Sequence, residues 1–342
     1  KSYKVPAKVK GGLVTPHFVQ FHLLPQTGLK LSQLKNLAEE IALSLGCHSC
    51  RIYRQGGKLN LEIPRQNRPK ISLLHLCRRI PHVPPCSPIL GLDGSGTPLL
   101  LHLPGPDVAH ALISGSTGSG KTALAQTMIA SLALFNRQSH LQLILIDPKR
   151  RGFGSFFSLP HLLCPPISNS QEASKMLSRL VSEMERRDQE GCILPRLVLF
   201  IDELADLLQT GGQEVQNSLT RLTQRGRSAG IHIVACTQKP TASAIGSLIK
   251  ANFPARLVGS VSSAEEARVA AGLPGTGAEK LTGRGDFILV VRGQISRFQA
   301  AYISEGEIAS LFKGEAQPQA RMPCFSIPEL IRPERFLKGG KR

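Results

Sequence analysis

The stretch Ala111-Leu-Ile-Ser-Gly-Ser-Thr-Gly-Ser-Gly-Lys-Thr122 decides the fold of this chain. Its apolar start is typical of a strand end, and residues 123–134 after it are compatible with a helix. Glycines let consecutive backbone N–H groups turn inward around an anion without Cβ clashes. A following helix adds its own N-terminal N–H groups and the positive end of its dipole. The stretch therefore predicts a loop that binds the phosphates of a nucleotide.

The octet 115–122 also assigns a role to each position. We expect Lys121 to reach the β- and γ-phosphates and Thr122 to hold Mg²⁺ through its hydroxyl. The predicted ligands are thus ATP or GTP, together with Mg²⁺. The remaining members of the loop are expected to surround the phosphates: Gly115, Ser116, Thr117, Gly118, Ser119 and Gly120.

Two carboxylates follow the apolar run 197–201, as Asp202 and Glu203. In P-loop proteins an acid at the carboxyl end of a buried strand binds Mg²⁺ beside the phosphates. We assign Asp202 to the magnesium and Glu203 to the base that orients and deprotonates the attacking water. A solvated helix start is the alternative, because acids also favour first turns. The complete phosphate loop upstream favours the catalytic interpretation.

Polar residues end two further apolar runs. Asp147 follows residues 141–146, where it either contacts the nucleotide or caps the next segment. Gln238 follows the run 231–235, where it either senses the γ-phosphate or belongs to an ordinary turn. The residues themselves leave both pairs of alternatives open.

Three arginines, Arg221, Arg225 and Arg227, lie on or just after the helix predicted behind the acidic strand. Helical spacing is compatible with a solvated face. Ring-shaped ATPases, however, often insert an arginine into the site of the neighbouring subunit. Spacing alone does not decide between these interpretations.

Charge is the clearest feature of the composition. The 342 residues contain 42 Lys and Arg against 24 Asp and Glu, a formal net charge of +18. Such an excess attracts polyanions, and for a nucleotide-binding protein the natural polyanion is nucleic acid. A basic tail is the alternative, since residues 332–342 are themselves basic. With 41% hydrophobic residues the chain is predicted to be globular.

Cysteine usage and hydropathy indicate the cellular compartment of the chain. Eight scattered cysteines predict a reducing environment with mostly buried thiols. Cys47 and Cys50 resemble half of a zinc site, but Cys77 and Cys86 are nine residues apart, which disfavours zinc. No apolar stretch approaches the roughly 20 residues of a membrane span. We expect a cytoplasmic chain as given, with membrane association if a longer chain carries an N-terminal anchoring segment.

The chain divides into four predicted parts. Residues 1–12 are expected to form a disordered basic end and residues 13–88 a small αβ domain, closed by four prolines within 81–88. Residues 89–305 alternate near-continuous apolar runs with amphipathic stretches, which predicts an α/β domain whose mostly parallel central sheet is covered on both faces. Residues 306–342 form a basic, proline-containing tail.

In this order, these residues resemble the motor part of the FtsK/SpoIIIE family of DNA translocases. Beyond the phosphate loop, the likeness extends over about residues 13–303. It is carried by the strings LILIDPK, PHLL, LVLFIDELADLL, RSAGIHIVACTQKP, SLIKANFPARLVGSVSS and GRGDFILV.

The resemblance implies a RecA-like P-loop ATPase domain that follows a small alpha-type domain, assembled as a homo-hexameric ring around double-stranded DNA. By motif, Gln238 matches the sensor position and Arg227 the arginine that acts across the subunit interface. Lys239, Lys250 and Arg268 match DNA-facing positions of the central channel. The implied function is ATP-driven DNA pumping with little sequence specificity.

Some positions depart from the family pattern. Ala264-Glu-Glu stands where a basic residue is usual, and residues 272–277 are richer in glycine. The roughly forty residues after Ile303 are too few for the winged-helix domain that reads orientation sequences. Two alternatives stay open: an ATPase that transfers mobile-element DNA or protein through a secretion channel, and a nucleotide-dependent DNA-binding scaffold.

Overall fold

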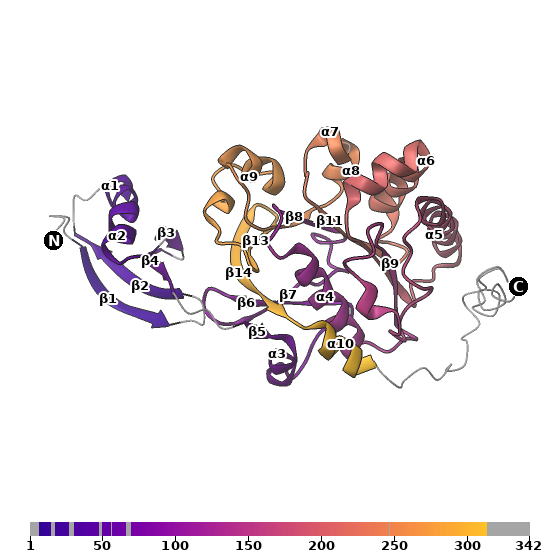
Figure 1. Cartoon of the computed structure of the whole chain (residues 1–342), viewed down its shortest axis with the longest axis horizontal. Coiled ribbons are helices and arrows are strands. Elements are labelled where there is room, and N and C mark those ends of the chain that lie inside the picture. The colour runs from indigo at the N-terminus through magenta and orange to yellow at the C-terminus, as the bar shows by residue number, and fades with distance from the viewer. Residues whose placement is uncertain are drawn as a thin grey trace, which may run out of the picture.

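The computed structural model describes residues 7–14, 18–26, 31–47, 50–55, 57–65, 70–245 and 247–312. Figure 1 shows an elongated molecule, with a small N-terminal domain at one end beside a larger α/β domain. Within the described ranges, no helix combines the length and apolar character that crossing a bilayer requires.

The small domain is a four-stranded antiparallel sheet with two short helices. The strand order is β1-β2-β4-β3, with β1 at Ala7–Val14, β2 at Phe18–Pro25, β3 at Arg51–Gln55 and β4 at Lys58–Pro64. The helices are α1 at Leu31–Asn36 and α2 at Ala38–Ser44. The core of this domain contains Leu34, Ala42, Ile52, Leu59 and Leu61.

Strand β1 corrects the prediction of a disordered end over residues 1–12. Residues 7–12 pair with β2, whereas residues 1–6 lie outside the described part. The side chains of β1 are mostly exposed, so main-chain hydrogen bonds rather than burial hold the strand. A basic, glycine-containing segment gives no hydrophobic alternation to predict such a strand.

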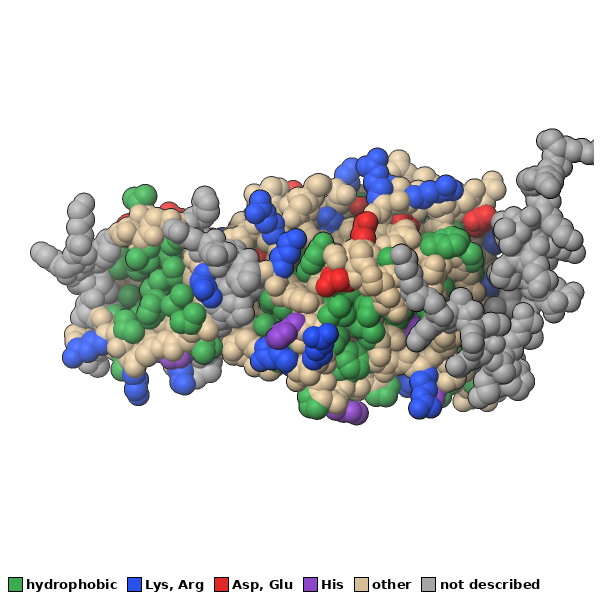
Figure 2. All heavy atoms as spheres, turned by 60° about the horizontal axis from the view of Figure 1, so that its bottom comes forward, with side chains coloured by type: hydrophobic (Ala, Val, Ile, Leu, Met, Phe, Trp, Pro, Cys, Tyr) green, Lys and Arg blue, Asp and Glu red, His purple; other side chains and the backbone are tan. Residues whose placement is uncertain are grey.

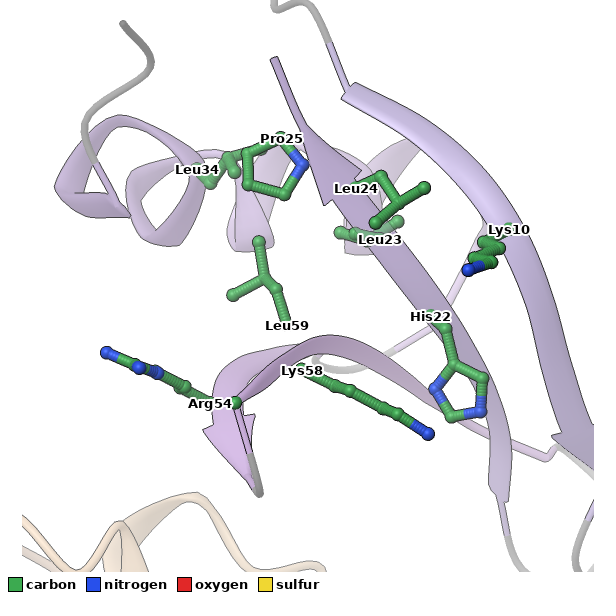
Figure 3. Close-up of a pocket in the computed structure, with 10 residues that line it drawn as sticks. Lys10, His22, Leu23, Leu24, Pro25, Leu34, Arg54, Lys58 and Leu59 are labelled. Atoms are coloured by element: carbon green, nitrogen blue, oxygen red, sulfur yellow. The ribbon is translucent and has the colours of Figure 1, made fainter. Parts of the chain in front are cut away.

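A hollow of about 640 Å³ opens in the small domain. Its apolar lining includes Leu23, Leu34 and Leu59, and the basic side chains of Lys10 and Lys58 also line it (Figure 3). Figure 2 shows hydrophobic side chains gathered on this domain with Lys and Arg around them. The positive charge of the chain therefore extends over both domains.

The large domain is built on a 10-stranded sheet in which β9, β10, β11, β8 and β12 are mutually parallel. The other half is antiparallel apart from the short strand β5 (Ile71–Ser72), which is parallel to β14, so the sheet is mixed. The parallel strands are β8 at Ala111–Ser114, β9 at Leu141–Ile146, β10 at Arg196–Ile201, β11 at Ile231–Thr237 and β12 at Ala255–Val258. The antiparallel strands are β6 at Ile89–Asp93, β7 at Pro98–Leu100, β13 at Asp286–Val291 and β14 at Gln294–Tyr302.

Helices cover both faces of this sheet, as the near-continuous apolar runs predicted. In β10, Phe200 packs in the core cluster that contains Met128 of α4, whereas Leu199 packs in the cluster that contains Leu177 of α5 and Leu219 of α6. The α/β prediction is thus confirmed. The helices are α3 at Leu73–Arg79, α4 at Lys121–Phe135, α5 at Ser170–Glu190, α6 at Leu204–Arg225, α7 at Ala242–Ile245, α8 at Ser247–Ala251, α9 at Ala264–Ala271 and α10 at Glu305–Phe312, with 3₁₀ turns η1 at Gly154–Phe156 and η2 at Ala278–Lys280.

Packing places the domain division earlier than the predicted boundary at residue 88. Strand β5 (Ile71–Ser72) pairs with β14, and Leu73 and Leu76 of α3 lie in the core of the large domain. We therefore propose a division between β4 and β5. The prolines of residues 81–88 mark a loop inside the large domain, because proline interrupts regular structure wherever it occurs.

Part of the predicted C-terminal tail is helical. Residues 306–312 of the predicted tail belong to α10, whose Ile308 and Phe312 are buried, and residues 313–342 lie outside the described part.

The four cysteines considered for zinc belong to two different cores. Cys47 and Cys50, with their Sγ atoms 3.4 Å apart, lie in the small domain, while Cys77 and Cys86 lie in the large one.

Candidate nucleotide-binding site

The phosphate loop lies where predicted, between β8 and α4 at the carboxyl edge of the parallel strands. Two of its glycines are required by close packing. A Cβ on Gly115, which has φ of 149°, would lie 2.8 Å from Ser119 Oγ. A Cβ on Gly120, with φ of 102°, would lie 3.0 Å from the backbone nitrogen of Gly285. Side chains at these positions would force the loop open.

Lys121 is the first residue of α4, and its head group folds back over the loop. Its Nζ donates hydrogen bonds to the carbonyl oxygens of Gly115 at 2.8 Å and Ser116 at 3.0 Å. Burial lowers the pKa of Lys121, while the charges of Glu203 and Asp202 act in the opposite direction. The ammonium is thus held inside the loop, where it would face a bound phosphate.

Thr122 and Asp202 meet beside the lysine. The Thr122 hydroxyl donates to Asp202 Oδ1 over 3.1 Å. Burial, followed by the charge of Asp147, raises the pKa of the Asp202 carboxyl. Hydroxyl and carboxylate oxygens are the ligands that Mg²⁺ prefers, and a cation would offset the crowding of two acids. The residues present therefore fit a magnesium ion next to the phosphate loop.

Asp147 makes the capping contact that was one of its two predicted roles. Its Oδ2 accepts hydrogen bonds from the backbone nitrogens of Gly152 at 2.8 Å and Phe153 at 2.9 Å. Gly152 in turn packs against Asp202, since a Cβ on this glycine would lie 2.9 Å from the Asp202 carboxyl. Asp147 thus shapes the wall behind the predicted magnesium ligand.

Replacing Asp147 with Ala is expected to lower the free energy of unfolding by about 2 kcal/mol, because two buried N–H donors lose their acceptor. Urea unfolding followed by circular dichroism measures this change. Asp206→Ala is the matched control, since Asp206 forms an exposed ion pair with Lys149 whose loss is expected to cost under about 1 kcal/mol. Equal effects of the two substitutions would contradict the structural role of Asp147.

The predicted base and the predicted sensor are in direct contact. The backbone nitrogen of Gln238 donates to the Glu203 carboxylate, at 3.2 Å to Oε1 and 3.3 Å to Oε2. The hydroxyl of Thr117, at the tip of the phosphate loop, donates to Gln238 Oε1 over 3.0 Å. Gln238 therefore links the acidic strand end to the phosphate loop through its backbone and its side chain.

Arg227 lies at the opposite edge of the sheet. It precedes β11, whereas Gln238 follows the same strand, and the seven residues of that strand span about 23 Å at 3.3 Å per residue. Its Nε donates to the Pro104 carbonyl over 3.3 Å, and the residue is exposed. The other two arginines pair within the chain, Arg221 with Glu185 and Arg225 with Asp188.

The predicted DNA contacts occupy α8, α9 and the turn after β11. Lys239 is exposed directly after Gln238. Burial lowers the pKa of Lys250, and the charges of Arg256 and Arg268 lower it further. Arg256 Nη2 also donates to the Lys250 carbonyl oxygen over 3.2 Å. Arg268 Nε donates to Glu265 over 2.9 Å. The acidic departure at residues 264–266 thus partly neutralises one predicted contact.

Sequence reasoning missed the loop that supports the phosphate loop from outside. The backbone nitrogens of Arg284 and Gly285 donate to the carbonyls of Gly118 at 3.2 Å and Ser119 at 2.9 Å. On the other side, the Ser116 backbone nitrogen donates to the carbonyl of Ser260 over 2.8 Å. The signal that could have predicted this loop is the pair of glycines on either side of Arg284, because glycine allows backbone conformations that other residues rarely adopt.

Comparison with protein families agrees with this geometry. The profile of the FtsK/SpoIIIE family matches residues 83–191 and 187–242. The profile of the FtsK alpha domain matches residues 1–65. The two profiles thus cover the small domain and the part of the large domain that carries the phosphate loop and the acidic pair.

Curated relatives point the same way. The DNA translocase FtsK of Staphylococcus epidermidis is 34% identical over 343 aligned residues, covering 90% of this chain and 42% of that protein. The DNA translocase FtsK of Sporosarcina ureae is 33% identical over 344 residues, covering 91% and 44%. The chain therefore spans less than half the length of these relatives.

Solved structures share the fold at lower identity. The conjugation coupling protein TcpA of pCW3, with ATPγS, has a TM-score of 0.61 at 19% identity and covers 90% of this chain and 94% of that one. The cytoplasmic domain of the type VII secretion ATPase EccC from Thermomonospora curvata also has a TM-score of 0.61, at 23% identity, covering 76% and 36%. With its phosphate loop, its acidic strand end and both matching profiles, this chain belongs to the FtsK/SpoIIIE family.

Proposed function

We propose that this chain is the ATP-hydrolysing motor of a double-stranded DNA translocase that works with little sequence specificity. The observation that carries the proposal is the contact of Gln238 with both Glu203 and Thr117, because it joins the hydrolytic acid, the phosphate loop and the next segment. The names of the curated relatives, DNA translocase FtsK, support the choice of DNA as the substrate.

Each site residue then has a task. Bound Mg²⁺ would neutralise charge on the β- and γ-phosphates. Lys121 would hold the same phosphates, and Thr122 and Asp202 would hold the cation. Glu203 would orient the attacking water and accept its proton, since its carboxylate is fixed by the Gln238 backbone.

Gln238 would convert hydrolysis into movement. Its side chain contacts Thr117 of the phosphate loop, and Lys239 follows it directly on the protein surface. A change at the γ-phosphate that alters the Thr117 contact would shift the segment bearing Lys239. Lys250 and Arg268, on the helices beyond, would meet the phosphate backbone of DNA without reading its bases.

The proposed assembly is a homo-hexameric ring around the duplex. Arg227 lies at the edge of the sheet remote from its own phosphate loop, which suits a residue that enters the site of a neighbouring subunit. A membrane-anchoring segment or membrane partner outside this chain is compatible with this arrangement.

We expect DNA to stimulate ATP hydrolysis, and we expect that stimulation to fall steeply with salt. Contacts with six to ten phosphates would lose about 10³-fold or more in affinity between 50 and 200 mM salt. Steady-state ATPase assays across a salt series, with and without linear duplex, measure this. A Lys239→Ala, Lys250→Ala double variant should show a shallower salt dependence. Hydrolysis that is indifferent to DNA at every salt concentration would argue against the proposal.

The two alternatives predict different observations. A scaffold without motion would bind DNA but would not displace a triplex-forming strand in an ATP-dependent manner. A transfer or secretion ATPase shares the fold, as the likeness to TcpA and EccC at 19% and 23% identity reflects. The curated FtsK relatives, at 33–34% identity, favour the translocase instead.

A further inference from the structure

The loop that supports the phosphate loop has a left-handed backbone, which is strained at Arg284. Gly283, Arg284 and Gly285 have φ values of 70°, 52° and 91°, a region that residues with side chains rarely adopt. Arg284 is the non-glycine residue in this run. Strained backbone persists where surrounding contacts hold it, and such strain clusters at functional sites. The amides of Arg284 and Gly285 that bond to the phosphate loop are therefore held in place by something else.

Asp286, the next residue, holds them together with two groups of β14: the Gln299 side chain donates to the Arg284 carbonyl over 2.9 Å, and the Ala300 backbone nitrogen donates to the Gly285 carbonyl over 2.7 Å. The Asp286 carboxylate is completely buried and accepts hydrogen bonds from the backbone nitrogen and hydroxyl of Thr282, both at 3.0 Å. It thereby closes the loop 282–286 upon itself. Burial by itself would raise the pKa of Asp286, but the hydrogen bonds and charge of Arg297 and the Thr282 contacts lower it. The carboxylate stays ionised inside the protein.

Arg297 of β14 connects Asp286 to the small domain. It donates to Asp286 through Nε at 2.9 Å and Nη2 at 2.7 Å, and through Nη1 to Glu62 of β4 at 2.6 Å. Its guanidinium also lies 4.4 Å from the ring centroid of Phe18 in β2. Glu62 and Phe18 are both buried, so one arginine joins both domains in a closed environment.

We infer that Glu62, Arg297 and Asp286 are positioning residues that couple the small domain to nucleotide binding at the phosphate loop. The path runs from Glu62 through Arg297 to Asp286, then through the amides of residues 284 and 285 to the carbonyls of Gly118 and Ser119. Removing the Glu62 charge leaves Arg297 held by Asp286 alone, so the guanidinium and the loop 282–286 bonded to it must adjust. Because the coupling free energy is the same in both directions, a small domain that alters nucleotide affinity must itself be stabilised or destabilised when nucleotide binds.

The test uses the full chain without DNA, so its outcome is independent of translocation. Glu62→Gln removes the charge from the small-domain end of the path, at a distance from the phosphates. We expect the Kd of MgATPγS, measured by isothermal titration calorimetry, to rise about fivefold or more. Glu62→Asp, which keeps the charge, should recover part of the affinity. Glu39→Gln, an exposed acid of the same domain, is the matched control and should bind like the unmodified chain.

Hydrogen–deuterium exchange separates coupling from simple loss of stability. In the unmodified chain, MgATPγS should slow exchange in residues 282–286 and also in β4 of the small domain. In the Glu62→Gln variant the change in β4 should disappear while the change at the phosphate loop remains. Phe18→Leu, which removes only the ring beneath Arg297, provides a second variant in case Glu62→Gln folds poorly. Nucleotide-dependent exchange in β4 that persists in both variants, or an unchanged Kd in both, would overturn the inference.

Discussion

ATP turnover is expected to fall by about a thousandfold or more when Lys121 is changed to Ala, which is the largest effect that we predict. The lysine head is held inside the phosphate loop by the carbonyls of Gly115 and Ser116. It is therefore in place before nucleotide arrives and loses little freedom on binding. A positive charge that is already positioned where negative charge develops on the phosphates typically makes the largest catalytic contribution of a single side chain.

A phosphate-release assay at saturating ATP measures this loss. The matched control is Lys175→Ala, which removes an equal charge from the exposed surface of α5 and should leave turnover within about twofold. Circular dichroism should show the same fold in both variants. If the alanine variant kept more than about a tenth of the original turnover, the role assigned to Lys121 would be wrong. The phosphate loop, residues 115–122, contains no second lysine that could replace it.

The sequence predicts the parallel half of the sheet well for a physical reason. Strands β9, β10 and β11 are buried on both faces, so their apolar runs are near-continuous and end abruptly at Asp147, Asp202 and Gln238. The change from apolar to polar marks the sheet edge directly. The same edge carries the phosphate loop, so the grouping of these residues followed from the pattern.

Other features left no such mark. Strand β1 is exposed along almost its whole length and is held by main-chain bonds, which carry no side-chain signature. The role of Asp286 depends on Arg297 eleven positions later and on Glu62 from another domain, and such pairing over long separations is invisible in local spacing. The sequence also did not decide between the two roles of Asp147, since both require a carboxylate at a strand end.

Arg227→Ala is expected to reduce turnover by about 10³-fold while leaving the fold and nucleotide affinity of the isolated chain unchanged. The side chain is exposed and precedes β11, whose seven residues span about 23 Å, whereas Gln238 follows that strand, so we expect Arg227 to act on the site of a neighbour rather than on its own. An arginine supplied by a neighbouring subunit typically contributes 10³–10⁵-fold. Arg225→Ala, which removes an arginine bound to Asp188 of its own chain, is the matched control and should remain active.

Mixing inactive variants tests the direction of this contribution. In rings formed from equal amounts of Lys121→Ala and Arg227→Ala subunits, half of the sites keep the lysine, and half of those face a neighbour that keeps the arginine. About a quarter of the original turnover should therefore return, because a head-to-tail interface places residues of two subunits in each site. If Arg227 acted on its own subunit, no site in the mixed ring would contain both residues. Absence of recovery, with mixed rings verified by mass spectrometry, would then exclude a role across the interface.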